Sequence, residues 1–112
     1  MDDKTEDIEV SPTGGLNSRI EGRWDLLEYR ALARLVAVLD YGAKKYGDEN
    51  WRLDPPELHL KHALGHIFRY LEARRLNGRQ PVPHRPGADD LGHAFCRLMF
   101  ALATEEDGEG RG

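Results

Sequence analysis

The chain has 112 residues, 39% of them hydrophobic and 32% charged, which suits one compact domain and is too little for two. Its formal net charge of −4 argues against a protein that coats nucleic acid, and no apolar run approaches the ~18 residues of a membrane span. The acidic N-terminus is unlike a secretory signal, and the single cysteine, Cys96, cannot form an internal disulfide. We therefore expect a cytoplasmic protein with neither a membrane nor a nucleic acid as partner.

Both ends of the chain differ in composition from its middle. Residues 1–22 contain few large apolar side chains, and residues 104–112 are acidic and rich in glycine. We expect the first to be a disordered arm and the second a disordered acidic tail. The folded domain is then residues 23–103. A core of that size buries a modest share of its surface, so we expect homo-oligomerisation to complete the fold.

Three helices and no strand are predicted within this domain, which makes the fold class all-α. The first, at about 25–46, has apolar side chains at helical spacing. Gly42 inside it is expected to permit close approach of another backbone. The second, at about 55–76, opens with two prolines, and the third spans about 88–103. The apolar seams of these two helices are Leu60, Leu64, Ile67 and Leu71, and Leu91, Phe95, Leu98 and Leu102.

The second predicted helix also carries a polar stripe, away from its leucine seam. His59, His62 and His66 fall within roughly 60° of one another, and His93 lies on a similar polar face of the third helix. Such a stripe is typical of a solvated surface, whereas His62 and His66 at i, i+4 could instead hold a transition metal. The chain contains no HExxH motif and no Cys/His quartet, so a dedicated zinc site is not favoured.

The segment YGAKKYGDENWR, residues 41–52, gathers lysines, tyrosines and a tryptophan around the end of the first helix. Lysine suits phosphate oxygens, and an aromatic ring can stack on a base. The alternative is a capped helix end whose lysines are favoured by the helix dipole, with Trp51 folded onto the core. Asp89 and Asp90 are candidate magnesium ligands, although the dipole also favours acids at the start of a helix.

Five short runs together resemble a known family: Asp25-Leu26-Leu27, Ala31-Leu32, the segment 41–52, Ala63-Leu64-Gly65-His66 and Asp90-Leu91-Gly92-His93-Ala94. The family is that of short, mostly phage-encoded dATP/dGTP diphosphohydrolases (MazZ-like), among the MazG-like all-α nucleotide pyrophosphohydrolases. The resemblance implies hydrolysis of a purine deoxynucleoside triphosphate to the monophosphate and pyrophosphate. It also implies Mg²⁺ or Mn²⁺ held by carboxylates, an oligomeric helical bundle and, for a phage-encoded member, the host cytoplasm.

The resemblance assigns roles to individual residues. The residues that match the hallmark segment and are implied to bind the nucleotide are Lys45, Tyr46, Asn50 and Trp51. His66 and His93 match the histidines of the family's second and third helices and are the implied catalytic residues. Asp89 and Asp90 are the acids beside them that we assign to the metal.

The chain departs from the family pattern in its charged residues. Asp90 stands where the family has a histidine, Arg30 and Arg34 stand where acids are expected, and the ExxE and ExxD signatures are not recognisable. The leading hypothesis is a nucleotide pyrophosphohydrolase, and the alternative is a non-catalytic helical module that binds a nucleotide or a protein. A nucleic-acid accessory protein using the arginines within 69–85 is a third hypothesis, which the net charge of −4 weakens.

Overall fold

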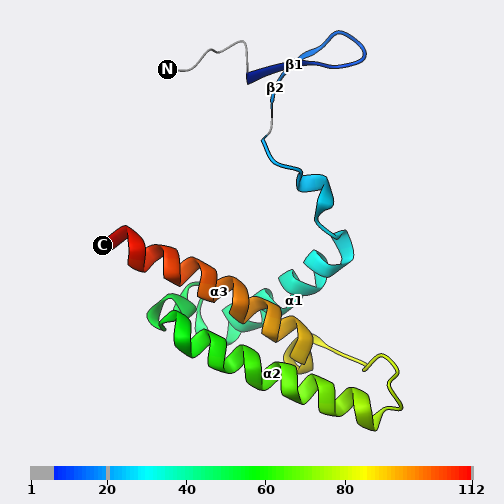
Figure 1. Cartoon of the computed structure of the whole chain (residues 1–112), viewed down its shortest axis with the longest axis vertical. Helices are drawn as coiled ribbons and strands as arrows, with labels where there is room; N and C mark the ends of the chain where they lie inside the picture. Colours follow the sequence, from blue (N-terminus) through cyan, green and yellow to red (C-terminus); the bar gives the residue numbers. More distant parts are fainter. Residues whose placement is uncertain (1–6, 20, 112) are drawn as a thin grey trace.

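The computed structural model describes residues 7–19 and 21–111. Three helices dominate it, so the predicted all-α fold class is confirmed (Figure 1). In chain order the elements are β1 (Ile8–Val10), β2 (Leu16–Ser18), the 3-10 turn η2 (Trp24–Leu26), α1 (Tyr29–Tyr46), η3 (Asn50–Leu53), α2 (Pro56–Leu76), η4 (Pro86–Ala88) and α3 (Asp90–Arg111). None of the helices of these described residues is both long enough and apolar enough to cross a membrane.

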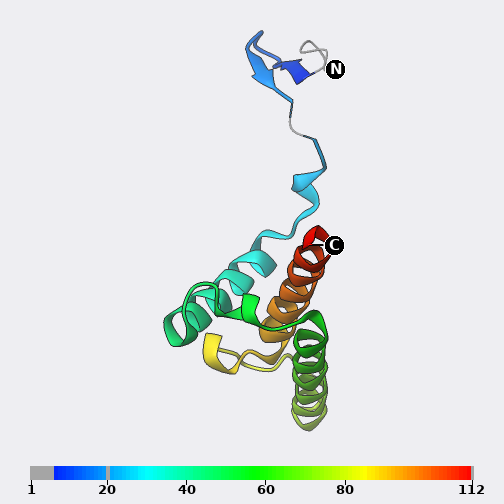
Figure 2. The same cartoon turned by 90° about the vertical axis from the view of Figure 1, so that its left-hand side faces the viewer.

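Helix α3 is the element on which the other two helices pack. Helices α2 and α3 lie side by side and antiparallel, and α1 packs against α3 (Figures 1 and 2). The contact between α1 and α3 forms a small apolar core of Leu35, Val38 and Cys96, with four half-buried side chains around it. The side of α2 that meets α3 is different in kind, because its buried residues are Ala63 and His59.

The leucine seams of α2 and α3 are not part of this core. Sequence periodicity marks them as the buried faces, yet their large apolar side chains are between 42% and 70% exposed. The residues concerned are Leu60, Leu64, Phe68 and Leu71 on α2 and Leu91, Phe95, Leu98 and Leu102 on α3. The small residues Ala63, Ala94 and Ala101 occupy the α2–α3 contact instead. Within one chain, therefore, the two helices leave their most apolar faces uncovered.

The N-terminal segment projects away from the helices as an arm (Figures 1 and 2). The radius of gyration is 19.0 Å, against about 13 Å for a compact domain of this length. Contrary to the expectation of no strand, β1 and β2 pair antiparallel, with Ile8 opposite Ser18. The turn between them is closed by Gly14 at φ 89°, a conformation that glycine adopts without strain. Residues 1–6 and 20 of the predicted arm lie outside the described residues.

The helix ends also differ from those expected. Helix α1 begins at Tyr29 rather than near residue 25, because the Glu28 side chain accepts a hydrogen bond from the Arg30 amide as an N-cap. Helix α3 runs on to Arg111 through the predicted tail. Thr104 is buried there and donates to the Phe100 carbonyl oxygen. Residue 112 lies outside the described residues, and the division into arm, domain and tail stays a prediction.

Close packing of α1 on α3 depends on Gly92 rather than on Gly42. A Cβ at Gly92 would lie 2.6 Å from Asp89 Oδ2 and 2.9 Å from Val38 Cγ2, whereas a Cβ at Gly42 would meet nothing within 4 Å. The expectation that Gly42 admits another backbone is therefore wrong. The side chain of Val38 and the carboxylate of Asp89 fill the space that any larger residue at Gly92 would need.

We expect Gly92→Ala to lower the free energy of unfolding by about 1–3 kcal/mol, the usual cost of overpacking. The matched control is Gly65→Ala in α2, where an added Cβ would meet nothing within 4 Å. That change should raise the free energy of unfolding by about 0.5–1 kcal/mol, because alanine restricts the unfolded chain. Urea unfolding followed by circular dichroism measures both, and equal effects of the two variants would contradict the role given to Gly92.

Candidate functional site

Two histidines from different helices lie face to face at the centre of the candidate site. The rings of His66 on α2 and His93 on α3 are stacked, with centroids 5.0 Å apart and planes 20° apart. His66 Nδ1 lies 2.8 Å from Asp90 Oδ1, and His93 Nε2 lies 2.8 Å from the Pro86 carbonyl oxygen. Each of these nitrogens donates, because its partner can only accept. The opposite nitrogen of each ring is then a basic lone pair, so the site presents two oriented bases.

Helix α1 brings an aromatic side chain and a cation to this pair. The Tyr41 ring meets the His93 ring edge-on, with centroids 6.4 Å apart. Lys45 Nζ lies 5.9 Å from the centroid of the Tyr41 ring and 5.1 Å from that of Tyr46. The hydroxyl of Tyr46, followed by Tyr41, raises the pKa of Lys45. Tyr41 therefore lies between the Lys45 ammonium and the His93 ring.

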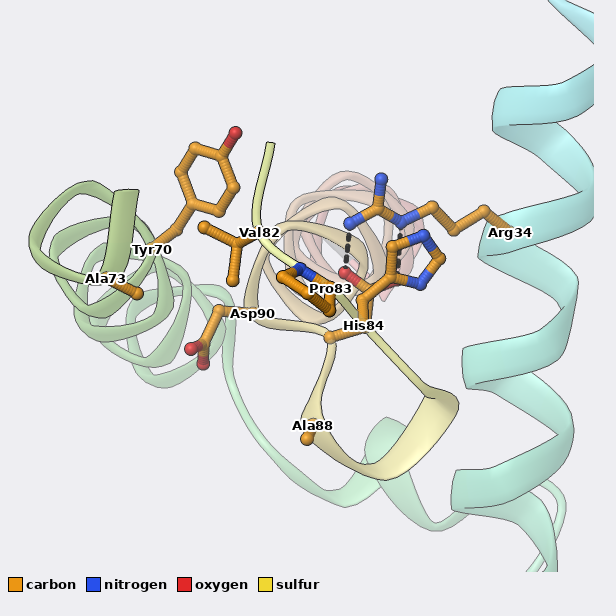
Figure 3. A pocket seen from close by; sticks show the side chains of 9 residues that line it. Arg34, Tyr70, Ala73, Val82, Pro83, His84, Ala88 and Asp90 are labelled. Atoms are coloured by element: carbon orange, nitrogen blue, oxygen red, sulfur yellow. Dashed lines mark hydrogen bonds and ion pairs between the residues drawn. The ribbon is translucent and has the colours of Figure 1, made fainter. Parts of the chain in front are cut away.

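Asp89 is engaged in holding the fold together. Its side chain is 1% exposed and accepts two hydrogen bonds from the Arg34 guanidinium of α1 and one, at 2.9 Å, from the Gly92 amide. Figure 3 shows Arg34 reaching across from α1 to this carboxylate, with His84 beside it. Burial alone would raise the pKa of Asp89, but these contacts outweigh it and hold the pKa below its usual value. A metal role for Asp89 would require Arg34 to withdraw.

Asp90 is placed differently from Asp89, although the two are adjacent. Its Oδ1 accepts from His66 and lies 3.5 Å from Arg69 Nε, whereas its Oδ2 takes part in none of the contacts recorded among the described residues. Over residues 7–19 and 21–111, no three or more His, Cys, Asp or Glu side chains converge as a metal-binding group. The assignment of Asp89 and Asp90 to a metal stays a prediction, and Asp90 is the better placed of the two.

The hallmark segment divides between the site and the core. The Trp51 ring stacks on the Phe100 ring with centroids 4.5 Å apart, and the Arg52 guanidinium lies 4.4 Å from the centroid of the Trp51 ring. This packing agrees with the alternative interpretation of Trp51 as a residue folded onto the core. Asn50 and Tyr46 are exposed. Lys45 therefore lies on the side of α1 that carries Tyr41, the neighbour of His93, whereas the Trp51 ring is already covered by Phe100.

His59 is a structural residue, although sequence spacing groups it with His66. It is completely buried. His59 Nε2 donates to the Trp51 carbonyl oxygen at 2.9 Å, and its Nδ1 lies 3.1 Å from Arg97 Nη1, which donates to it. The solvated-surface interpretation of the stripe is therefore wrong for His59. Helical spacing could not show this, because the covering residues come from distant parts of the chain.

The profile of the family described as "dATP/dGTP diphosphohydrolase, N-terminal" matches residues 11–111. The chain belongs to this family. No curated protein and no solved structure matches it. The resemblance inferred from sequence is thus confirmed at the level of the family, and the match includes the histidine pair, Lys45 and the Arg34–Asp89 contact.

The Arg34–Asp89 pair should be a main support of the fold of this family member. We expect Asp89→Ala to lower the free energy of unfolding by about 3 kcal/mol, the lower end of the range for a broken buried ion pair, because Arg34 is 32% exposed. The control is Glu72→Ala, which breaks an exposed pair with Arg75 and should leave stability unchanged within error. Urea unfolding of both variants is the measurement. A stable Asp89→Ala protein would contradict this role.

The stability of the protein should fall as the pH drops below neutrality. Burial lowers the pKa of His93; the Pro86 carbonyl partly offsets this effect, and His66 reinforces it. Burial also lowers the pKa of His62. The folded state therefore binds protons less readily than the unfolded state, in which histidine titrates near 6.5. Urea midpoints should decline from pH 7.5 to 5.5, and His93→Gln should reduce the slope. An unchanged slope in this variant would rule out the contribution of His93.

Proposed function

We propose that this protein hydrolyses the purine deoxynucleoside triphosphates dATP and dGTP to the monophosphate and pyrophosphate. Membership of the dATP/dGTP diphosphohydrolase family supports the substrate class. The single observation that carries the reaction is the His66–His93 pair, oriented by Asp90 and the Pro86 carbonyl, with Lys45 on the facing helix. An oriented base, with a cation on the neighbouring helix, is suited to the attack of water on a phosphoanhydride.

In this proposal His66 is the general base. Its Nε2 removes a proton from water as the water oxygen bonds to the α-phosphorus, and the bond from that phosphorus to the bridging oxygen breaks to release pyrophosphate. Asp90, bonded to His66 Nδ1, stabilises the imidazolium that forms. Lys45 neutralises charge on the phosphates. His93 is the second proton carrier, and Tyr46 and Asn50 are exposed where they can contact the nucleoside.

The proposal includes Mg²⁺ or Mn²⁺ arriving with the nucleotide. Magnesium is usually held by one or two carboxylates together with substrate phosphates, without an all-protein cage. Asp90 Oδ2 fits such a role, whereas the oxygens of Asp89 are taken by Arg34 and the Gly92 amide. Bound in this way, the cation would stabilise negative charge on the phosphates. The proposal also takes the protein to act as a homo-oligomer in which this site stays accessible.

The test is incubation of the protein with a panel of triphosphates, with Mg²⁺, with Mn²⁺ and with chelator, followed by chromatography of the products. We expect monophosphate and pyrophosphate from dATP and dGTP. His66→Ala should reduce turnover by about 10²–10⁴-fold, the usual contribution of a general base, with little change in Tm. The control is His84→Ala, which removes an exposed loop histidine outside the stacked pair and should keep full turnover.

Binding measurements separate the proposal from the alternative of a non-catalytic module. Calorimetric titration with a triphosphate should give an affinity that Lys45→Ala weakens by about tenfold, the value of one charge-assisted contact. Binding without release of pyrophosphate would support the module and overturn the hydrolase. A wild-type protein that neither binds nor hydrolyses any triphosphate of the panel would overturn both.

A further inference from the structure

The exposed leucine seams of α2 and α3 form one continuous apolar face. We define the leucine face as these eight residues: Leu60, Leu64, Phe68, Leu71, Leu91, Phe95, Leu98 and Leu102. Their spacing repeats at three and four residues, so each set follows one side of its helix. The two helices are antiparallel neighbours (Figure 1). Viewed along its own helix from N- to C-terminus, each stripe is rotated in the same sense away from the α2–α3 contact. Both stripes therefore lie on the same side of the helix pair.

This face is too large to be an ordinary monomer surface. Monomers rarely expose a contiguous apolar patch of more than a few hundred Å². The fully buried apolar core of the chain is small by comparison, with Leu35, Val38 and Cys96 at its centre. A standard interface takes about 800 Å² and 20–30 residues from each partner. Two packed helices of 21 and 22 residues offer a surface of that size.

Charges at the two ends of the leucine face are opposite in sign. Arg74, Arg75 and Arg79 lie where α2 ends, and Glu72 offsets one of them. Exposed Glu105 and Glu106 lie at the other end, near the C-terminus of α3. Contacts His66–His93 and Arg52–Asp107 fix the stagger of the helices. Counted from them, Arg75 and Glu106 lie at about equal distances on either side of the middle of the face.

We propose that the leucine face binds the same face of a second copy, about a two-fold axis perpendicular to the helices. A largely apolar face can pair with itself, and this axis places the Arg75 end of each copy against the Glu105–Glu106 end of the other. A two-fold axis parallel to the helices would instead bring the Arg75 ends of the two copies together, and likewise the Glu105–Glu106 ends, so that like charges would repel. The four helices then enclose the leucines in one core.

The proposed dimer leaves the nucleotide site open. His66 lies about 200° around its helix from Leu64, and His93 about 200° from Leu91, so both histidines point away from the leucine face. Helix α1 covers α3 on that other side through Leu35 and Val38. The inference names the surface behind the homo-oligomer included in the proposed function, but it rests on the leucine face alone. A failure of hydrolysis and a failure of dimerisation are therefore separately visible.

The first test is the mass of the protein in solution, from size exclusion with light scattering. The wild type should have at least twice the 12.7 kDa of one chain, and Leu64→Asp and Leu98→Asp should shift it to the monomer mass. The control is Val36→Asp, which places the same charge on an exposed apolar position of α1 outside the face and should keep the wild-type mass. A monomeric wild type would overturn the proposal. Loss of assembly on deleting residues 1–22 would also overturn it, because the arm would then be the segment that binds the leucine face.

A crosslinking test needs no destabilising change in the apolar face. In the double variant Arg75→Cys/Glu106→Cys, a bismaleimide crosslinker should join two copies covalently, because the axis brings the Arg75 end of α2 in each copy to the Glu106 end of α3 in the other, one helix spacing away. Arg75→Cys alone should give no covalent dimer. Natural Cys96 does not interfere, because it is buried and burial raises the pKa of its thiol to about 11. Covalent dimers of the single variant, or none of the double variant, would overturn the perpendicular axis.

Discussion

The contact between Arg34 and Asp89 determines where the other site residues stand. It ties the middle of α1 to the residue that precedes α3, and the same carboxylate caps the first turn of α3 through the Gly92 amide. The start of α3 is therefore fixed in direction and in distance from α1. Asp90 and His93 follow within one turn, so their positions relative to α1 are fixed as well. An ion pair with no role of its own in the proposed chemistry thus aligns α1 with the start of α3, which carries Asp90 and His93.

Local patterns in the sequence were enough to predict the helices. Apolar spacing gives all three, Gly47 ends α1 at φ 101°, a positive value that glycine adopts without strain, and the prolines start α2. The errors lie at the ends, since the Glu28 cap that starts α1 at Tyr29 and the contact of Arg52 with Asp107 depend on side-chain geometry. The β1–β2 hairpin is too short to show a period of two.

The candidate site could be predicted only in part. Helical spacing puts His66 and His93 on polar faces, which the structure brings together. The family resemblance adds Lys45, which lies beside Tyr41, the neighbour of His93. Spacing cannot tell Asp89 from Asp90, because what separates them is Arg34, which lies 55 residues before Asp89 in the chain. Nor does periodicity say what covers an apolar seam. It marks the leucines as one apolar side of each helix, but it does not show that this side is exposed in a single chain.

The different surroundings of the two tryptophans give the protein a built-in optical probe. Trp24 lies in η2, where the arm meets the helical body, and is 66% exposed, whereas Trp51 in η3 is stacked on Phe100 of α3. The emission of Trp51 is sensitive to loss of the helical body, and that of Trp24 to movement of the arm alone. Unfolding of the two parts is therefore distinguishable in one fluorescence trace, without any label attached to the protein.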